Sequence, residues 1–128
     1  MTSKNLLGLP PPNMLQLGLS GKSEDSQESK PGIYLLESRL VNGYPVWIQK
    51  EGSNAIWFNK HSSGWIVGSE SKVGNDFGGI KGPSGIDDYP SQIQDGFEYY
   101  HDGGWHSAAT STDIVFRNIS INFIKISL

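Results

Sequence analysis

Histidine and aspartate side chains are the strongest metal-binding candidates in this sequence, because it contains no cysteine. The three histidines are His61, His101 and His106. A zinc site needs three or four ligands, and the sequence has neither a cysteine nor a His-x-x-x-His pair to supply them. Asp76 and residues 87–88 lie in a glycine-rich stretch, but they lack the alternating aspartate spacing of a calcium loop. We therefore expect no metal site and no cofactor.

Short catalytic motifs are present only as fragments. Residues 76–78 match the Asp-Phe-Gly tripeptide of protein kinases, but the chain lacks the other kinase motifs. The glycines of residues 79–85 are not followed by the Lys and Ser or Thr of a phosphate-binding loop. No Gly-x-Ser-x-Gly elbow occurs, and carboxylates such as Glu98 and Asp102 are too common a pair to indicate a glycosidase. The sequence therefore predicts a protein that is not an enzyme and has no catalytic residues.

Large aromatic side chains are the most distinctive candidates for binding. Each buries roughly 150–250 Å², so most of them are expected in the core of a small β domain. The alternative is a solvent-facing platform, as in a lectin-like carbohydrate-binding module, where rings stack on sugars or hold a proline-rich peptide. The aromatic residues considered for the core or for this platform are Trp47, Trp57, Trp65, Trp105, Tyr99 and Tyr100.

Strands must position these rings, and residues 42–68 predict three of them. In the first, Val46 and Ile48 alternate with Trp47 and Gln49, and two similar patterns follow between Gly, Asn and Ser turns. We predict an all-β fold, a single small antiparallel domain of about seven or eight short strands over residues 32–128. The other expected strands cover residues 33–37, 97–100, 105–107, 114–116 and 119–128.

Turn residues divide the predicted strands. The pair Asn42-Gly43 indicates a tight hairpin, because both residues tolerate positive φ. Residues 69–96 show no strand pattern, and a loop of this length in a compact domain is often functional. Apolar residues that could hold this loop against the core are Phe77, Ile80, Ile86, Tyr89 and Ile93.

Residues 1–31 have a different composition, which predicts an extended arm and a serine-rich linker outside the domain. Residues 20–31 contain too little apolar surface to offset the entropy of ordering. The leucines recur at a spacing of two, which suits an extended strand added to a partner's sheet edge. The arm residues expected to bind a protein partner are Leu15, Leu17, Leu19, Pro11 and Pro12.

Charge and hydropathy narrow the classes of partner. The formal net charge is −3 and no basic cluster occurs, so nucleic-acid binding is not expected. Prolines interrupt the only apolar stretch near the N-terminus, so neither a signal peptide nor a membrane span is expected. These features favour a cytoplasmic protein, with association with the cytoskeleton as one hypothesis.

Two segments share the pattern His-x-x-Gly-Trp, residues 61–65 and 101–105, which indicates two similar aromatic hairpins or a coincidence. Together with Asn-Gly-Tyr-Pro-Val-Trp and Gly-Trp-Ile-Val-Gly, this sequence resembles a small Trp/Gly-rich β module found, often in tandem, in uncharacterised proteins, notably of protists. The resemblance covers roughly residues 32–116 and implies an interaction or structural module. The leading hypothesis is therefore a non-enzymatic structural or adaptor protein within a larger intracellular assembly, and the alternative is a carbohydrate-binding module with exposed tryptophans.

Overall fold

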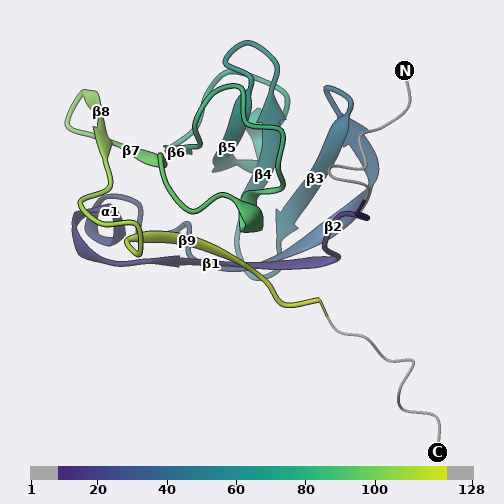
Figure 1. Cartoon of the computed structure of the whole chain (residues 1–128), viewed down its shortest axis with the longest axis horizontal. Helices are drawn as coiled ribbons and strands as arrows, with labels where there is room; N and C mark the ends of the chain where they lie inside the picture. The colour runs from purple at the N-terminus through teal and green to yellow at the C-terminus, as the bar shows by residue number, and fades with distance from the viewer. Residues whose placement is uncertain (1–8, 121–128) are drawn as a thin grey trace, which may run out of the picture.

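A computed structural model describes residues 9–120, and these form one curled antiparallel sheet of nine strands in the order β8-β7-β6-β5-β4-β3-β2-β1-β9 (Figure 1). The all-β prediction is confirmed. The sheet curls so far that Phe97, just before β7, meets Phe116 of β9 with ring centroids 5.0 Å apart. The elements are β1 (Met14–Leu19), α1 (Gly21–Ser26), β2 (Gly32–Val41), β3 (Tyr44–Gln49), β4 (Asn54–Asn59), β5 (Gly64–Ser69), η2 (Glu70–Lys72), β6 (Ile80–Lys81), η3 (Pro90–Gln92), β7 (Glu98–His101), β8 (Gly104–Ser107) and β9 (Ile114–Asn118).

Tight turns join consecutive strands where the sequence supplies residues that accept positive φ. Asn42 and Gly43 have φ of 56° and 85°, and they connect β2 to β3 as the sequence predicted. Asp102 and Gly103, with φ of 52° and 83°, connect β7 to β8 in the same way. Two successive positive φ values define the type I′ turn, whose twist matches that of the flanking strands.

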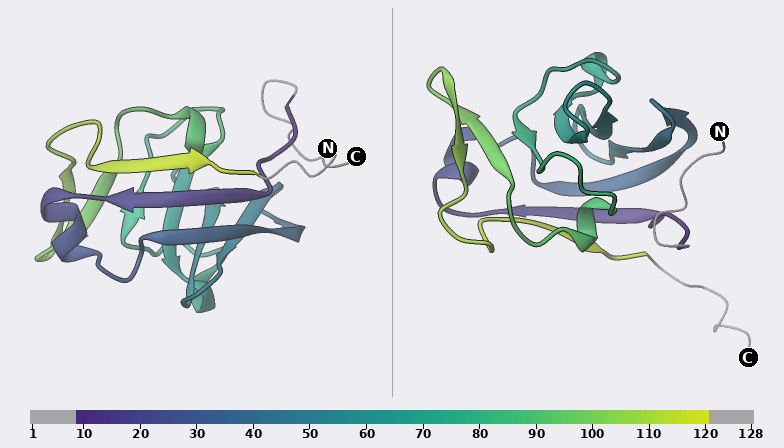
Figure 2. Two further views of the ribbon diagram at one scale, coloured as in Figure 1. Left: turned by 90° about the horizontal axis from the view of Figure 1, so that it is seen from below. Right: turned by 45° about the horizontal axis from the view of Figure 1, so that its top comes forward.

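The N-terminal leucines belong to this chain's own sheet, and the prediction that they bind a partner is wrong. Strand β1 lies between β2 and β9 (Figure 2). Leu15 is paired with Tyr34 of β2, and Leu17 is paired with Phe116 of β9. Leu15 is 0% exposed and Leu17 is 1% exposed. The extended conformation was predicted correctly, but the strand pairs with strands of its own chain. Because β1 is covalently linked to those strands, this pairing costs less entropy than binding a separate partner.

The rest of the predicted arm is also packed onto the domain, so the predicted boundary at residue 32 does not hold. Leu19 packs against the core, Pro11 is half-buried, and Pro12 is buried with its carbonyl accepting a bond from Trp47 Nε1 at 2.8 Å. The predicted linker contains α1, in which Ser23 is buried and its hydroxyl donates to Ser20 O at 2.8 Å. Residues 1–8 lie outside the described part.

Apolar side chains form two clusters, one on each face of the sheet. The inner core fills the concave side, and the outer core covers β3, β4 and β5 on the convex side. The inner core contains Leu15, Leu17, Tyr34, Trp47, Ile56, Phe58, Trp65, Val67, Ile80, Tyr89, Phe97, Tyr99, Ile114 and Phe116, and the outer core contains Val46, Ala55, Trp57 and Ile66.

The last predicted strand, residues 119–128, falls almost wholly outside the described residues.

Alkaline pH is expected to destabilise the fold through Tyr34. Burial raises the pKa of its hydroxyl above the ordinary value near 10, and that hydroxyl donates to Lys30 O at 2.6 Å. Because the pKa of Tyr34 is higher in the folded state than in the unfolded state, its contribution to the free energy of unfolding is complete below about pH 10. Above that pH the free energy of unfolding falls by about 1.4 kcal/mol per pH unit. Urea denaturation at about pH 8 and pH 11 checks this, and Tyr34→Phe should lose less stability between the two pH values than the natural chain; an equal loss would contradict the assignment.

Candidate functional site

The sheet buries most of the aromatic residues considered for a binding platform. Trp47 and Trp57 are 0% exposed, Trp65 is 1% exposed and Tyr99 is 6% exposed. These four residues are buried, as expected for most of the aromatic residues, and the alternative of a solvent-facing platform is wrong for them. Trp105 is 37% exposed. Of the six aromatic residues considered for the core or the platform, Trp105 and Tyr100, which is 44% exposed, therefore have substantially exposed rings.

Hydrogen bonding of the indole N–H groups also distinguishes the three buried tryptophans from Trp105. The buried Trp47, Trp57 and Trp65 donate their indole N–H groups to the carbonyl oxygens of Pro12 at 2.8 Å, Asn75 at 3.1 Å and Asp88 at 2.8 Å, respectively. For Trp105, the described residues provide no such acceptor. Its indole N–H is therefore free to bond to water or to a ligand.

Strand pairing explains why Trp105 points outward. Side chains of directly paired residues lie on the same face of a sheet. Trp105 pairs with Tyr100 across the β7–β8 hairpin, and Glu98, two residues earlier on β7, pairs with Lys81 of β6. Lys81 in turn pairs with Ile66, which belongs to the outer core. The outer face of β5–β8 therefore carries Trp105 beside Tyr100, which is 44% exposed, and not Tyr99.

The two His-x-x-Gly-Trp segments both form hairpins but present their tryptophans to opposite faces. In β5, Trp65 pairs with Phe58 and enters the inner core. In β8, Trp105 pairs with Tyr100 on the outer face. The turns also differ, because four residues separate the Asn59–Gly64 pair and two separate His101 from Gly104. The motif thus encodes a hairpin but not the face that the tryptophan occupies.

An open groove with a volume of about 620 Å³ lies on this outer face, and we call it the outer groove. Six large hydrophobic side chains are exposed among residues 9–120, and three of them (Phe77, Tyr100 and Trp105) line it. Such clustering indicates a binding surface more than scattered exposure does. The groove is lined by His61, Ser62, Ile66, Asp76, Phe77, Gly78, Lys81, Tyr100 and Trp105.

Two aromatic rings and a lysine form one side of the outer groove. The rings of Tyr100 and Trp105 meet edge to face, with centroids 5.4 Å apart. Lys81 Nζ lies 4.5 Å from the centroid of the Trp105 ring and 3.5 Å from Glu98 Oε1. An ammonium group over an indole face is attracted by the ring quadrupole. Lys81 therefore joins the aromatic pair to the acidic residue beside it.

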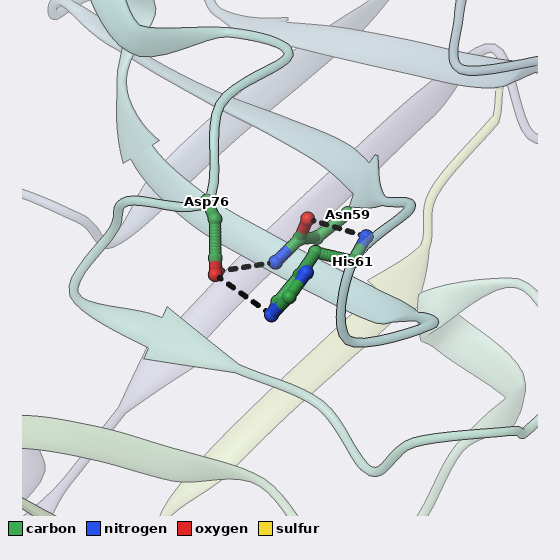
Figure 3. A network of polar contacts seen from close by, with 3 residues as sticks. All are labelled: Asn59, His61 and Asp76. Carbon is green, nitrogen blue, oxygen red and sulfur yellow. Dashed lines mark hydrogen bonds and ion pairs between the residues drawn. The ribbon is translucent and has the colours of Figure 1, made fainter.

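Another side of the outer groove, which we call the polar wall, is lined by His61 and Asp76, and both contact the buried Asn59 (Figure 3). Asn59 Nδ2 donates to Asp76 Oδ1, and Asn59 Oδ1 accepts from the backbone N–H of His61 at 3.0 Å. His61 Nε2 lies 3.9 Å from Asp76 Oδ2, with 81% and 55% of the two side chains exposed. The buried Asn59 thus orients an exposed Asp–His pair, whose carboxylate can still accept further hydrogen bonds.

Comparisons of the chain with protein-family models, curated proteins and solved structures found no match. The resemblance to the Trp/Gly-rich module therefore stays a prediction. No helix within residues 9–120 combines the length and apolar character needed to cross a membrane. The same residues contain no group of three or more His, Cys, Asp or Glu side chains arranged to hold a metal ion.

The loop after β5 supplies the residues that sequence reasoning did not assign to a site. It was expected to be anchored by apolar side chains, and Ile80 and Tyr89 are indeed buried, whereas Phe77 and Ile86 are exposed. The segment around Asp76 and Phe77 is held instead by Trp57, which donates to Asn75 O, and by Gly79, whose N–H donates to Val67 O at 2.8 Å. An exposed phenylalanine among glycines was the available sequence signal.

Substituting Gly78 by Ala is expected to push this loop off β5. An added Cβ would lie 2.4 Å from Ile66 Cγ2 and 2.7 Å from Val67 O. Overpacking of this kind costs about 1–3 kcal/mol of stability, measurable by urea denaturation. Gly104→Ala is the matched control, because a Cβ there meets nothing within 4 Å. Equal stability of the two variants would show that the loop is not packed this closely.

Proposed function

We propose that the protein is a non-enzymatic carbohydrate-binding protein that holds its glycan in the outer groove. The observation that carries this proposal is Trp105, an exposed indole with a free N–H, which lies beside exposed Tyr100 and lines the same groove as His61 and Asp76. An aromatic ring can cover the apolar CH face of a sugar, while the indole N–H bonds to a hydroxyl. This combination of one apolar face and several polar edges is the chemistry that a sugar ring presents.

The polar residues of the groove complement the rings. Asp76 supplies acceptors, and Lys81 and Trp105 supply donors, all in a groove with a volume of about 620 Å³. Sites of a few hundred Å³ with a few oriented polar groups are typical for small ligands. The openness of the site supports binding without catalysis, since enzymes usually exclude water around the reacting groups, whereas His61 and Asp76 are largely exposed.

The adaptor hypothesis loses its main motive, because Leu15 and Leu17 are buried in the protein's own sheet. An adaptor role would have to use the folded surface. The outer groove offers one route, since proline-rich peptides also dock between exposed aromatic rings. Peptide binding is therefore the competing outcome in the test of the carbohydrate proposal.

The test is a screen of the full chain against immobilised oligosaccharides and proline-rich peptides. The expected result is saturable binding to at least one oligosaccharide family, with competition by the same sugar in solution. A Kd between about 1 mM and 1 μM corresponds to roughly 4–8 kcal/mol, a range suited to one open groove. Binding only to peptides, or to nothing in the screen, would contradict the proposal.

A further inference from the structure

We infer that the glycan is uncharged, an inference that rests on the carbohydrate-binding function proposed above. The ionisable side chains that line the outer groove lie in two pairs, each closer than 4.0 Å. Lys81 is paired with Glu98, and Asp76 lies beside His61. An acidic sugar would therefore find no unpaired ammonium group in the groove.

An anionic sugar is disfavoured from both sides of the groove. To pair with its carboxylate or sulfate, Lys81 would have to leave Glu98, which lies 3.5 Å away, and the face of Trp105. The carboxylates of Asp76 and Glu98 would repel the incoming negative charge. With His61 neutral, the groove residues together with Glu98 carry a net charge of −1, which adds to this repulsion.

A cationic sugar meets a different obstacle. Ammonium groups of this chain already lie over two groove rings, Lys81 over Trp105 at 4.5 Å and Lys72 over Phe77 at 5.3 Å. An added ammonium group could stack on either ring only by displacing one of these lysines, which would then repel it. Neutral hydroxyl groups have neither problem, because each can accept from Lys81 or Trp105 and donate to Asp76.

The test compares neutral with charged oligosaccharides of matched length by calorimetric titration of the full chain. The neutral probes are cello-, manno- and N-acetylchito-oligosaccharides, and the charged probes are oligogalacturonates and chitosan oligomers. Titrations at about 0.01 M and about 1 M salt change the screening length from about 30 Å to 3 Å. We expect the best neutral ligand to change its Kd by less than about twofold between these salts, and the charged ligands to bind at least about tenfold more weakly.

A Glu98→Gln variant sharpens the test. It leaves Lys81 without its carboxylate partner, so binding of oligogalacturonate should strengthen about tenfold at low salt while neutral binding stays within about twofold. If a charged oligosaccharide binds most tightly to the natural chain and Trp105→Ala abolishes that binding, the neutral-ligand inference is overturned and the carbohydrate function stands. If no oligosaccharide of any class binds, the carbohydrate function itself fails.

Discussion

Replacing Leu17 by Asp is expected to leave the chain unfolded at room temperature. Leu17 is 1% exposed and lies on β1 between β2 and β9. Removing such a side chain by Leu17→Ala costs about 2–5 kcal/mol, and a buried carboxylate costs more. Because small domains have only about 5–15 kcal/mol of total stability, the charged variant should lose its cooperative thermal transition in circular dichroism.

The matched control is Gln16→Asp. Gln16 is the next residue on β1, its side chain is exposed, and it pairs with Arg117 of β9. The same charge placed there should leave the melting temperature close to that of the natural chain, because an exposed carboxylate beside Arg117 is not desolvated. If Leu17→Asp melts like Gln16→Asp, β1 is not part of the folded core.

Replacing Trp105 by Ala is expected to remove most of the glycan affinity without unfolding the protein. The ring is 37% exposed and contacts Tyr100 and Lys81 rather than the inner core. Loss of a central aromatic contact costs a binding site about 2 kcal/mol or more, which is roughly thirtyfold in Kd. Titration of the ligand found in the screen measures this loss, and thermal denaturation checks the fold.

Leu40→Ala provides the comparison for Trp105→Ala. Leu40 is 49% exposed but does not line the outer groove. It therefore reports the effect of removing exposed apolar surface elsewhere, and its Kd should match that of the natural chain. Equal loss of affinity in both variants, or no loss in Trp105→Ala, would show that the glycan does not contact this ring.

The local sequence pattern predicted which segments form strands better than it predicted which strands pair with one another. Alternating apolar residues and the Asn42-Gly43 turn predicted strands and a hairpin, because both depend on residues close in sequence. The spacing of Leu15 and Leu17 predicted an extended strand with one apolar face, but not which sheet that face would join. That choice depends on β2 and β9, and β9 lies about a hundred residues away along the chain.

The site was harder to predict for the same reason. Trp65 and Trp105 share a motif, yet sheet register places one inside and the other outside. The outer groove joins residues of a turn, a loop and four strands, and its loop wall is positioned by contacts with β4 and β5. A one-residue change of register would turn Trp105 inward, and single-sequence periodicity does not fix that register.

The most direct test of the proposed glycan site follows the four indole N–H signals by nuclear magnetic resonance during ligand titration. Three indoles donate to backbone carbonyls inside the fold, and Trp105 is the exposed one. A Trp105→Phe variant assigns its signal by subtraction. The binding proposal predicts that the Trp105 signal shifts progressively with added neutral oligosaccharide while the signals of Trp47, Trp57 and Trp65 stay in place. A Trp105 signal that does not move at saturating ligand would contradict it.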